Sequence, residues 1–453
     1  MAETFERVLV ANRGTVARRL VRMLAEEGLE SVAVFHEGDV HEGDVEQPWV
    51  EEADFPQYLN GAATADTYLD PSRMVAAAMD TGCEMLHPGV GYLAEDIDLH
   101  ATAARANVGI LGVATDVLKK VYRRFALFQE VQKLAIPAAR CSEDMPSGAD
   151  VEKIGRTAGT LGYPLVVRAA HASVARRVDV PDALLDAVAA VRADTTFLAH
   201  DRSIYLEGLA DGLRTVRTVI VGDRRGSLLS VGSYADSVGL NGAWWLAEMG
   251  RAVASDVLRA EMIEDSVRIA EAVGFVGVGS VRWVVTPSGQ CFFGGLSIAL
   301  PEAWPLADRV LGVDLARTGL RIDRGERLGW DHYEVEPDSH GIVLRLVHLD
   351  ADTGERPEGL LERLDLPEGP DVQALAGAAE GVRCSRDTDP VLAELIVLGP
   401  TRQAALVKAR SALEAVRVEG VPTNRDALLA LMGGKDFWQG RYDIGSIRRA
   451  LQE

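Results

Sequence analysis

The sequence predicts a chain of α/β and α+β class that opens with a parallel β-sheet covered by helices. Residues 5–11 (FERVLVA) form a short apolar run, residues 12–15 (NRGT) turn the chain, and a helical pattern follows. A second apolar run at 30–35 begins further strand and helix alternation, which continues to Gly112. This alternation is typical of parallel strands joined by helical crossovers.

The length of 453 residues exceeds what one hydrophobic core usually supports, so two or three domains are expected. The pattern along the chain favours three, at residues 1–113, 114–329 and 330–453. The middle domain has short apolar runs between helical patterns, which predicts mixed α and β structure. Its expected strands lie at 165–168, 203–206, 217–221, 281–285 and 291–293. The last domain is expected to begin with a strand at 341–346 and to end in helices.

The composition excludes several classes of protein. The formal net charge is −21 and the pI is near 4.9, whereas nucleic-acid binders rely on clustered Lys and Arg. There is no run of 18 or more apolar residues and no basic and then apolar start, so we expect no membrane span and a cytoplasmic location. The four cysteines are scattered without a CxxC pair, which predicts neither disulfides nor zinc.

A tandem repeat of five residues follows the second predicted strand. His36 to Val40 (HEGDV) is followed at once by the same five residues, His41 to Val45. The imidazoles and carboxylates of the repeat are of the kind that bind metal ions. A solvated acidic loop is the competing interpretation, because loops accept insertions at little thermodynamic cost. The sequence leaves both interpretations open.

Five motifs occur in a fixed order across nearly the whole chain. They read VANRGTVARRL, HPGVGYLAE, GYPLVVRA, GVDL and EGVPTN. In order and spacing they resemble the biotin carboxylase family, a group of ATP-grasp enzymes; one such string alone would be weak evidence, but five in order are specific. The resemblance implies an N-terminal parallel-sheet domain, an ATP-grasp domain with a lid at about 137–204, and a C-terminal domain that closes the active site.

The resemblance also implies a reaction and a set of partners. In the family, MgATP activates bicarbonate and N1 of biotin is carboxylated, while the biotin is attached to a separate carrier. No Ala-Met-Lys-Met string that would accept biotin occurs in this sequence, so no covalent biotin is expected. The implied partners are a genuine biotin carboxylase, a biotin carrier and a carboxyltransferase, within a homo- or hetero-oligomer.

The positions of the family's metal ligands carry other residue types in this chain. Two Glu and one Asn hold magnesium in the family, and these positions fall on Arg282, Gly295 and Ser297. An Arg in place of a carboxylate inverts an interaction worth about 4 kcal/mol between charges roughly 4 Å apart at an effective dielectric of about 20. We therefore expect no metal site and no bound cofactor, with ATP and magnesium as the open alternative.

Some of the family's nucleotide contacts are preserved in kind. Two lysines that contact phosphates in the family fall on Arg124 and Arg168, and Arg is also a phosphate donor. Glu207 matches a family Glu near the ribose and adenine. The lid's glycine run is lost, because the matching stretch at 169–177 reads AAHASVARR. Its two arginines either contact phosphate or belong to a solvated loop.

The positions that serve the carboxylation step are also changed. The catalytic base position falls on Ala303, the bicarbonate Arg on Ala299, and the enolate-stabilising Arg on Gln373. The lysine of the bicarbonate pocket falls on Trp244, which is followed by Trp245. This apolar pair is expected in the core or, if it is exposed in the former cleft, as a plug or a partner contact.

Two residues look catalytic but have a simpler interpretation. Glu302 precedes Ala303 and would supply the base if the alignment with the family were shifted by one residue. The motif GVDL at 312–315 fixes that alignment without a gap. His87 stands before Pro88 in a turn and is interpreted as a structural residue.

Three functional hypotheses follow from these residues. Selective loss of the chemical groups, with the turns that set the fold retained, favours a non-catalytic scaffold or regulatory subunit of an acyl-CoA carboxylase complex. An ATP-grasp enzyme with another anionic substrate is the second hypothesis. An active biotin carboxylase is the third.

Overall fold

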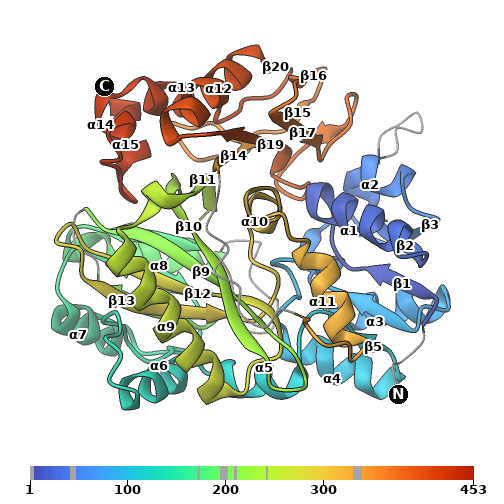
Figure 1. The fold of residues 1–453 in the computed structure, drawn as a ribbon, viewed down its shortest axis with the longest axis horizontal. Coiled ribbons are helices and arrows are strands. Elements are labelled where there is room, and N and C mark those ends of the chain that lie inside the picture. The colour runs from blue at the N-terminus through green and yellow to red at the C-terminus, as the bar shows by residue number, and fades with distance from the viewer. Residues whose placement is uncertain are drawn as a thin grey trace.

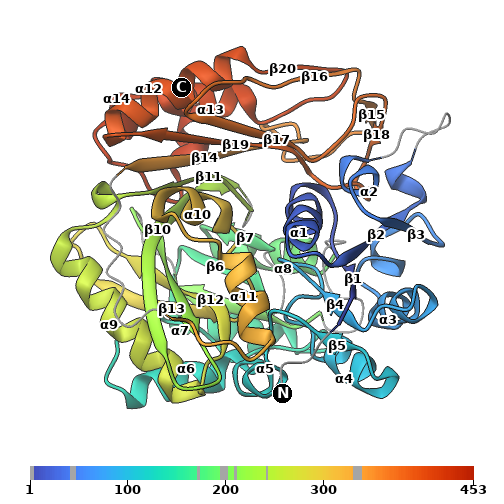
Figure 2. The same ribbon diagram turned by 45° about the vertical axis from the view of Figure 1, so that its right-hand side comes forward.

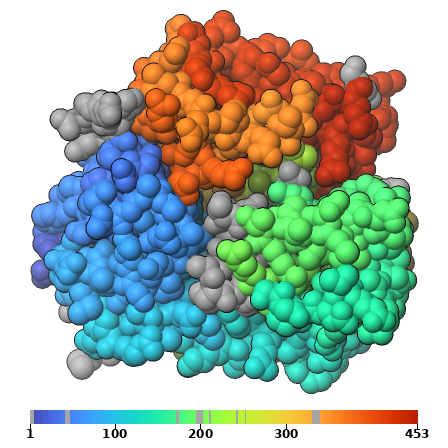
Figure 3. All heavy atoms as spheres, turned by 180° about the vertical axis from the view of Figure 1, so that it is seen from behind, coloured from blue at the N-terminus to red at the C-terminus, as the bar shows by residue number. Residues whose placement is uncertain are grey.

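The computed structural model describes residues 5–40, 47–170, 174–193, 202–208, 212–240, 243–329 and 339–452. Figures 1 and 2 show the N-terminal, central and C-terminal parts of the chain as three packed masses. All three parts reach the face drawn in Figure 3, where their atoms lie side by side.

The first five strands form one parallel sheet in the order β3-β2-β1-β4-β5. They are β1 (Arg7–Val10), β2 (Glu30–His36), β3 (Phe55–Leu59), β4 (Met85–His87) and β5 (Gly109–Ile110). Helix α1 (Gly14–Glu26) covers one face, and α3 (Pro71–Asp80) and α4 (Ile97–Ala106) cover the other (Figure 1). The predicted parallel sheet between helices is confirmed, and burial on both faces explains its continuous apolar strands.

A small antiparallel sheet has the order β7-β6-β8. Its strands are β6 (Leu165–Ala169), β7 (Ala175–Val178) and β8 (Ile204–Gly208). Helices α7 (Val151–Leu161) and α8 (Leu184–Ala193) pack on it and share its separate apolar core. This unit, apart from most of β8, lies within residues 137–204, which the family resemblance assigns to the lid.

A large antiparallel sheet joins the central and C-terminal parts of the chain in the order β13-β12-β9-β10-β11-β14-β19-β17. Its strands are β9 (Arg214–Gly222), β10 (Leu228–Leu240), β11 (Ala243–Met249), β12 (Gly277–Val285), β13 (Cys291–Ser297), β14 (His340–Val347), β17 (Val372–Ala376) and β19 (Val391–Gly399). The pairing of β11 with β14 connects the two parts.

The other described elements surround these sheets. The helices are α2 (Pro48–Glu51), α5 (Thr115–Val121), α6 (Arg124–Lys133), α9 (Asp256–Val273), α10 (Trp304–Leu311), α11 (Leu315–Asp323), α12 (Arg402–Ala415), α13 (Arg425–Gly433), α14 (Lys435–Trp438) and α15 (Ser446–Gln452). The short strands are β15 (Gly359–Leu360), β16 (Arg363–Asp365), β18 (Arg383–Cys384) and β20 (Arg417–Glu419). Within the described ranges, every helix is too short or too polar to cross a membrane.

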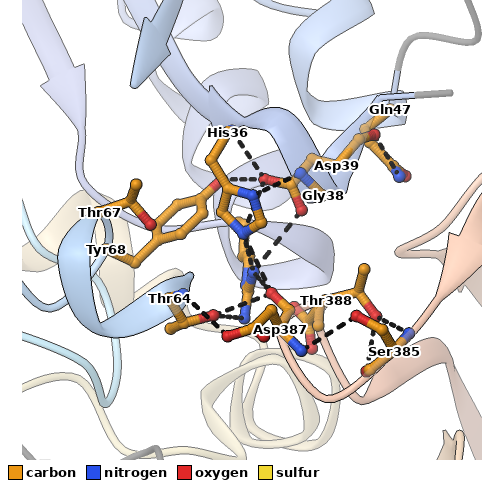
Figure 4. Close-up of polar contacts among 12 residues, drawn as sticks. His36, Gly38, Asp39, Gln47, Thr64, Thr67, Tyr68, Ser385, Asp387 and Thr388 are labelled. Atoms are coloured by element: carbon orange, nitrogen blue, oxygen red, sulfur yellow. Dashed lines mark hydrogen bonds and ion pairs between the residues drawn. The ribbon is translucent and has the colours of Figure 1, made fainter. Parts of the chain in front are cut away.

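A loop from the C-terminal part closes over the carboxyl end of the N-terminal sheet (Figure 4). The backbone carbonyl of Asp387 accepts hydrogen bonds from Arg13 Nη1 at 2.6 Å, from His36 Nε2 at 3.0 Å and from Thr64 Oγ1 at 2.9 Å. The Asp387 carboxylate also accepts from the Thr64 backbone N–H. These contacts hold the first and last parts of the chain together across more than 300 residues of sequence.

The first copy of the tandem repeat takes part in this contact. Nδ1 of His36 accepts from the Gly38 backbone N–H, so the ring proton lies on Nε2 and is donated to Asp387. Asp39 accepts from Tyr68 Oη at 2.7 Å and lies 3.6 Å from Arg13. His36 and Asp39 of the first copy are therefore engaged within the fold and Glu37 and Val40 are exposed, while residues 41–46, with the second copy, lie outside the described residues.

Gly14 is the point at which this contact tolerates no side chain. Its φ is +61°, and a Cβ atom there would overlap the carboxylate of Asp389. We expect Gly14→Ala to lower the free energy of unfolding by about 2 kcal/mol or more, since left-handed backbone and displacement of Asp389 both cost energy. Gly28→Ala is the control, because Gly28 has a φ of +70° with no atom near its Cβ position. If urea unfolding showed an equal loss of unfolding free energy in the two variants, the prediction would be contradicted.

Candidate functional site

Two arginines lie directly opposite each other on neighbouring strands of the large sheet. Arg282 on β12 pairs in register with Arg217 on β9, and opposite residues of antiparallel strands project from the same face. Two like charges in this arrangement repel unless each has a carboxylate partner. The structure supplies one carboxylate to each, from different elements.

Arg217 is paired with a carboxylate on the next strand. Its Nε lies 2.5 Å from Asp236 Oδ2 on β10, and both side chains are largely buried. Burial by itself raises the pKa of Asp236, but the adjacent Arg217 outweighs burial and lowers that pKa below its ordinary value. This pair is therefore a closed, charge-neutral unit.

Arg282 is paired with a carboxylate from the small sheet. Its Nη2 lies 2.9 Å from Glu207 Oε2 on β8, and Arg168 Nε on β6 approaches the same oxygen at 2.8 Å. Burial raises the pKa of Glu207, but Arg168 and Arg282 outweigh burial and hold that pKa at about 2. The carboxylate is thus ionised, and it links the small sheet to the large one.

The guanidinium of Arg124 fills the space beside Gly295. Gly295 has a φ of +151°, and a Cβ atom there would lie 3.0 Å from Arg124 Nη1. Arg124 donates to the backbone carbonyl of Gly294, to which Arg282 Nη2 also donates at 2.7 Å. Arg124 also lies over the ring of Tyr205, 4.3 Å from its centroid. Guanidinium groups therefore lie at two of the three positions that match the family's metal ligands: that of Arg282 at its own position, and that of Arg124 beside Gly295.

Ser297, the third position that corresponds to a metal ligand of the family, is hydrogen-bonded to a residue from the N-terminal part. Ser297 Oγ donates to Glu95 Oε1 at 2.8 Å, and the backbone N–H groups of Ile298 and Ala299 donate to the same oxygen at 2.6 and 3.2 Å. The bicarbonate-Arg position, Ala299, is thus part of a turn fixed by Glu95. Glu95 ends the motif HPGVGYLAE, and that position was its only sequence signal.

These residues do not fit magnesium with ATP. Around Glu207 and Asp236 lie four guanidinium groups, so four positive and two negative charges leave a surplus of two positive charges. They belong to Arg124, Arg168, Arg217 and Arg282. Magnesium requires oxygen ligands, and the described residues contain no cluster of three His, Cys, Asp or Glu side chains that could hold a metal ion.

The predicted bicarbonate pocket is filled by side chains that pair with one another. Trp244 is 5% exposed, and its Nε1 donates to Glu302 Oε2 at 2.7 Å. The guanidinium of Arg345 lies 3.7 Å from the centroid of the Trp244 ring and contacts the carboxylates of Glu302 and Glu394. Glu302 is therefore tied to two partners. Trp245 is 1% exposed, so the suggestion of an exposed tryptophan pair was wrong and core packing is correct.

The other two predicted carboxylation positions lie apart from each other. Ala303 is buried and precedes α10. Gln373 is exposed on β17 at the end of the large sheet, and two strands separate β17 from β11 with Trp244. The structure therefore brings together Arg124, Arg168 and Glu207 with Arg282, but does not place Gln373 with them.

The lid and the His87 turn have structural contacts of their own. Arg177 is paired with Asp179 at 2.6 Å, and Arg176 donates to the Ala175 carbonyl, while residues 171–173 lie outside the described part. His87 Nδ1 accepts from the backbone N–H of Gly89 at 3.0 Å, as its position in a turn predicts.

Three family models together match nearly the whole chain. The model of the biotin carboxylase N-terminal domain matches residues 4–118, and that of the biotin carboxylase C-terminal domain matches residues 344–449. Residues 124–330 match the ATP-binding domain of the carbamoyl-phosphate synthase L chain.

Curated relatives are similar along their full or partial length. Biotin carboxylase 2 of Bacillus subtilis is 25% identical over 99% of this chain and 100% of its own length. The small subunit of 2-oxoglutarate carboxylase from Hydrogenobacter thermophilus is 25% identical over 97% of this chain and 92% of its own. The mitochondrial alpha subunit of methylcrotonoyl-CoA carboxylase from Oryza sativa is 27% identical over 98% of this chain and 60% of its own.

Solved structures share the fold. The biotin carboxylase domain dimer of the Hydrogenobacter thermophilus 2-oxoglutarate carboxylase, a complex with MgADP, ADP and bicarbonate, superposes with a TM-score of 0.87 at 24% identity, covering 99% of this chain and 98% of that one. A biotin carboxylase complex from Campylobacter jejuni gives 0.85 at 22% identity, over 98% and 99% of the two chains.

Proposed function

This chain belongs to the biotin carboxylase family, and from that premise we propose that it is a non-catalytic member that serves as a scaffold or regulatory subunit of a biotin-dependent acyl-CoA carboxylase complex. One observation carries the proposal. Guanidinium groups of Arg282 and Arg124 lie where the family resemblance calls for metal-binding carboxylates. The surplus positive charge there repels magnesium rather than binding it.

The groups that the family uses for the carboxylation step are absent from their positions as well. The base position is Ala303, and the neighbouring Glu302 is held by Trp244 and Arg345. Loss in both half-reactions supports a role outside catalysis more than a change of substrate. The names of two relatives, each a carboxylase subunit, support a place within an assembly. A partner carrier would supply the biotin.

An activity assay tests the loss of catalysis. Phosphate release from ATP with magnesium, bicarbonate and free biotin is measured for this chain beside an active member of the family. We expect a rate at least about a thousandfold lower, since charge-stabilising groups contribute that much to phosphoryl transfer. Bicarbonate-dependent hydrolysis near the rate of the active enzyme would establish a working biotin carboxylase instead.

Native purification tests the assembly. The chain is tagged in its own cells, purified at low salt and separated by size, and the fractions are probed with streptavidin and analysed by mass spectrometry. We expect a biotinylated carrier and a carboxyltransferase or a genuine biotin carboxylase to elute with the chain. Elution free of all of these proteins would contradict the proposed role.

A further inference from the structure

The small unit, which consists of the sheet β7-β6-β8 with helices α7 and α8, has one polar face. In β8, Ile204 and Leu206 point into the apolar core of the unit itself. Tyr205 and Glu207 alternate with them and therefore project from the opposite face, yet they are only 3% and 5% exposed. Arg168 lies opposite Tyr205 on β6 and shares this face. Another part of the chain therefore covers the polar side chains on this side of the sheet.

Two arginines that are fixed to the large sheet contact this polar face. Arg282 on β12 pairs with Glu207 at 2.9 Å, and its side chain is largely buried. Arg124, at the start of α6, lies over the ring of Tyr205, 4.3 Å from the ring centroid. Both arginines also donate to the backbone carbonyl of Gly294 on β13. The small unit and the large sheet are thus joined by an ion pair and by a cation over an aromatic ring.

Apolar packing does not account for this junction. Among the described residues, the apolar core of the small unit shares no member with the core around the large sheet. The backbone passes from one to the other at residues 139 and 140. Ala139 donates to Phe293 on β13, whereas the carbonyl of Arg140 accepts from Gly208 on β8. Rotation of the backbone between Ala139 and Arg140 would therefore move the small unit without breaking either of these bonds.

We propose that Arg282 and Arg124 form a clasp with Glu207 and Tyr205, and that this clasp holds the small unit closed against the large sheet without any ligand. It is an autoinhibitory contact, because the chain's own side chains occupy the polar face of the small sheet. Without Arg282, the Glu207 carboxylate loses part of its compensation in the closed position and gains water in an open one, so opening becomes more favourable. The inference goes beyond the proposed function, since neither the loss of catalysis nor the assembly requires this contact.

Cys141 is a native reporter of this junction. It pairs with Glu207 in an isolated β-bridge and packs beside the core around the large sheet. Burial raises the pKa of its thiol to about 11, and the nearby Arg124 and Arg282 hold that pKa below what burial alone would give. Opening of the small unit would expose this thiol to solvent. The other three cysteines are buried in other elements: Cys83, Cys291 and Cys384.

Alkylation of the folded full chain with iodoacetamide, followed by peptide mass spectrometry, tests the proposal at each cysteine. In Arg282→Met, Cys141 should react at least about tenfold faster than in the unaltered chain, since loss of one partner of a buried pair favours local opening. Altered ionisation does not explain such an increase, because loss of a nearby positive charge raises the pKa of the thiol and slows alkylation. Arg124→Met should also accelerate the reaction of Cys141, and it decides the outcome if Arg282→Met does not fold.

Two further variants serve as controls. Arg156→Met should leave the rate at Cys141 unchanged, because Arg156 is exposed on α7 and pairs with Glu152 within the small unit. Arg282→Lys keeps the positive charge and should stay within about twofold of the unaltered chain. An unchanged rate at Cys141 in Arg282→Met and Arg124→Met, or equal acceleration of all four cysteines in both, would overturn the proposal. So would a large slowing at Cys141 when millimolar MgATP is added to the unaltered chain, because the small unit would then be open until a ligand closed it.

Discussion

Glu248→Gln is expected to lower the free energy of unfolding by about 3–5 kcal/mol, because it breaks a buried ionic network. The Glu248 carboxylate is 1% exposed and accepts from His340 Nε2 at 3.0 Å, from Arg402 Nε at 2.8 Å and from Tyr442 Oη. This network joins β11 and β14 to the C-terminal helices. Without the negative charge, the buried Arg402 guanidinium loses its carboxylate partner and keeps its hydrogen bond to the Trp438 carbonyl.

The same network gives a pH dependence with a defined sign. Burial raises the pKa of Glu248, but His340 and Arg402 outweigh burial and lower that pKa to about 2. The stabilisation is therefore full above the unfolded-state pKa of about 4.3 and is lost as the pH falls toward 2. The difference between the variant and the unaltered chain in urea unfolding should be large at neutral pH and should shrink in acid.

Glu414→Gln is the matched control for this experiment. Glu414 is half-exposed on α12 and forms an i,i+4 pair with Arg410, which is worth only a few tenths of a kcal/mol. A loss of equal size in the two variants would show that the buried network contributes nothing beyond a surface pair.

Mild acid is expected to destabilise the protein through its buried histidines. Burial lowers the pKa of His87, His100 and His348 from 6.5 to about 4 in each case. The unfolded chain then binds more protons than the folded one, so stability is full above pH 6.5 and falls as the pH drops toward 4. At about pH 5 each histidine costs roughly 2 kcal/mol by linkage.

His87→Gln isolates one of these contributions. The variant should lose less stability than the unaltered chain between pH 7.5 and 5, by about 2 kcal/mol, in urea unfolding at the two pH values. Leu86→Val on the same strand is the control. It weakens the core without removing a titrating group, so it should lower the free energy of unfolding by the same amount at both pH values. An unchanged pH dependence in His87→Gln would refute the assignment.

Much of the fold could be predicted from local sequence patterns. Apolar runs separated by helical patterns predicted the parallel sheet, and the expected strand at 30–35 is β2 at Glu30–His36. The order of the five motifs indicated the family before any contact was known. Each of these features depends on residues that are neighbours in sequence, where periodicity and turn residues carry the information.

The candidate site was predictable only in part. Motif positions selected Arg124, Arg168, Glu207 and Arg282 as members of one site, and the structure places them together. Their pairing was not foreseen. Arg282 was expected to repel a metal ion, but its attachment to Glu207 spans 75 residues of sequence and depends on how the small sheet faces the large one.

Two residues that shape the site, Asp236 and Arg345, had no recognisable sequence signal, and Glu95 had only its place at the end of a motif. Each of the three neutralises or fixes a site residue that belongs to another element. An acidic or basic residue in a strand gives no indication of its partner, because strand order and register decide which side chains meet. The partners of the loop at Asp387, which closes over the N-terminal sheet, are likewise decided by the packing of elements that are far apart in sequence.

The sequence by itself determined the family, the order of strands and helices, and the residue types at each position of the site. The tertiary structure alone decided that Arg282 and Arg124 share the Gly294 carbonyl, that Glu207 serves two guanidinium groups, and that Trp244 is buried. The physical reason is that charge interactions depend on distance and burial, and both are set by the packing of elements remote in sequence.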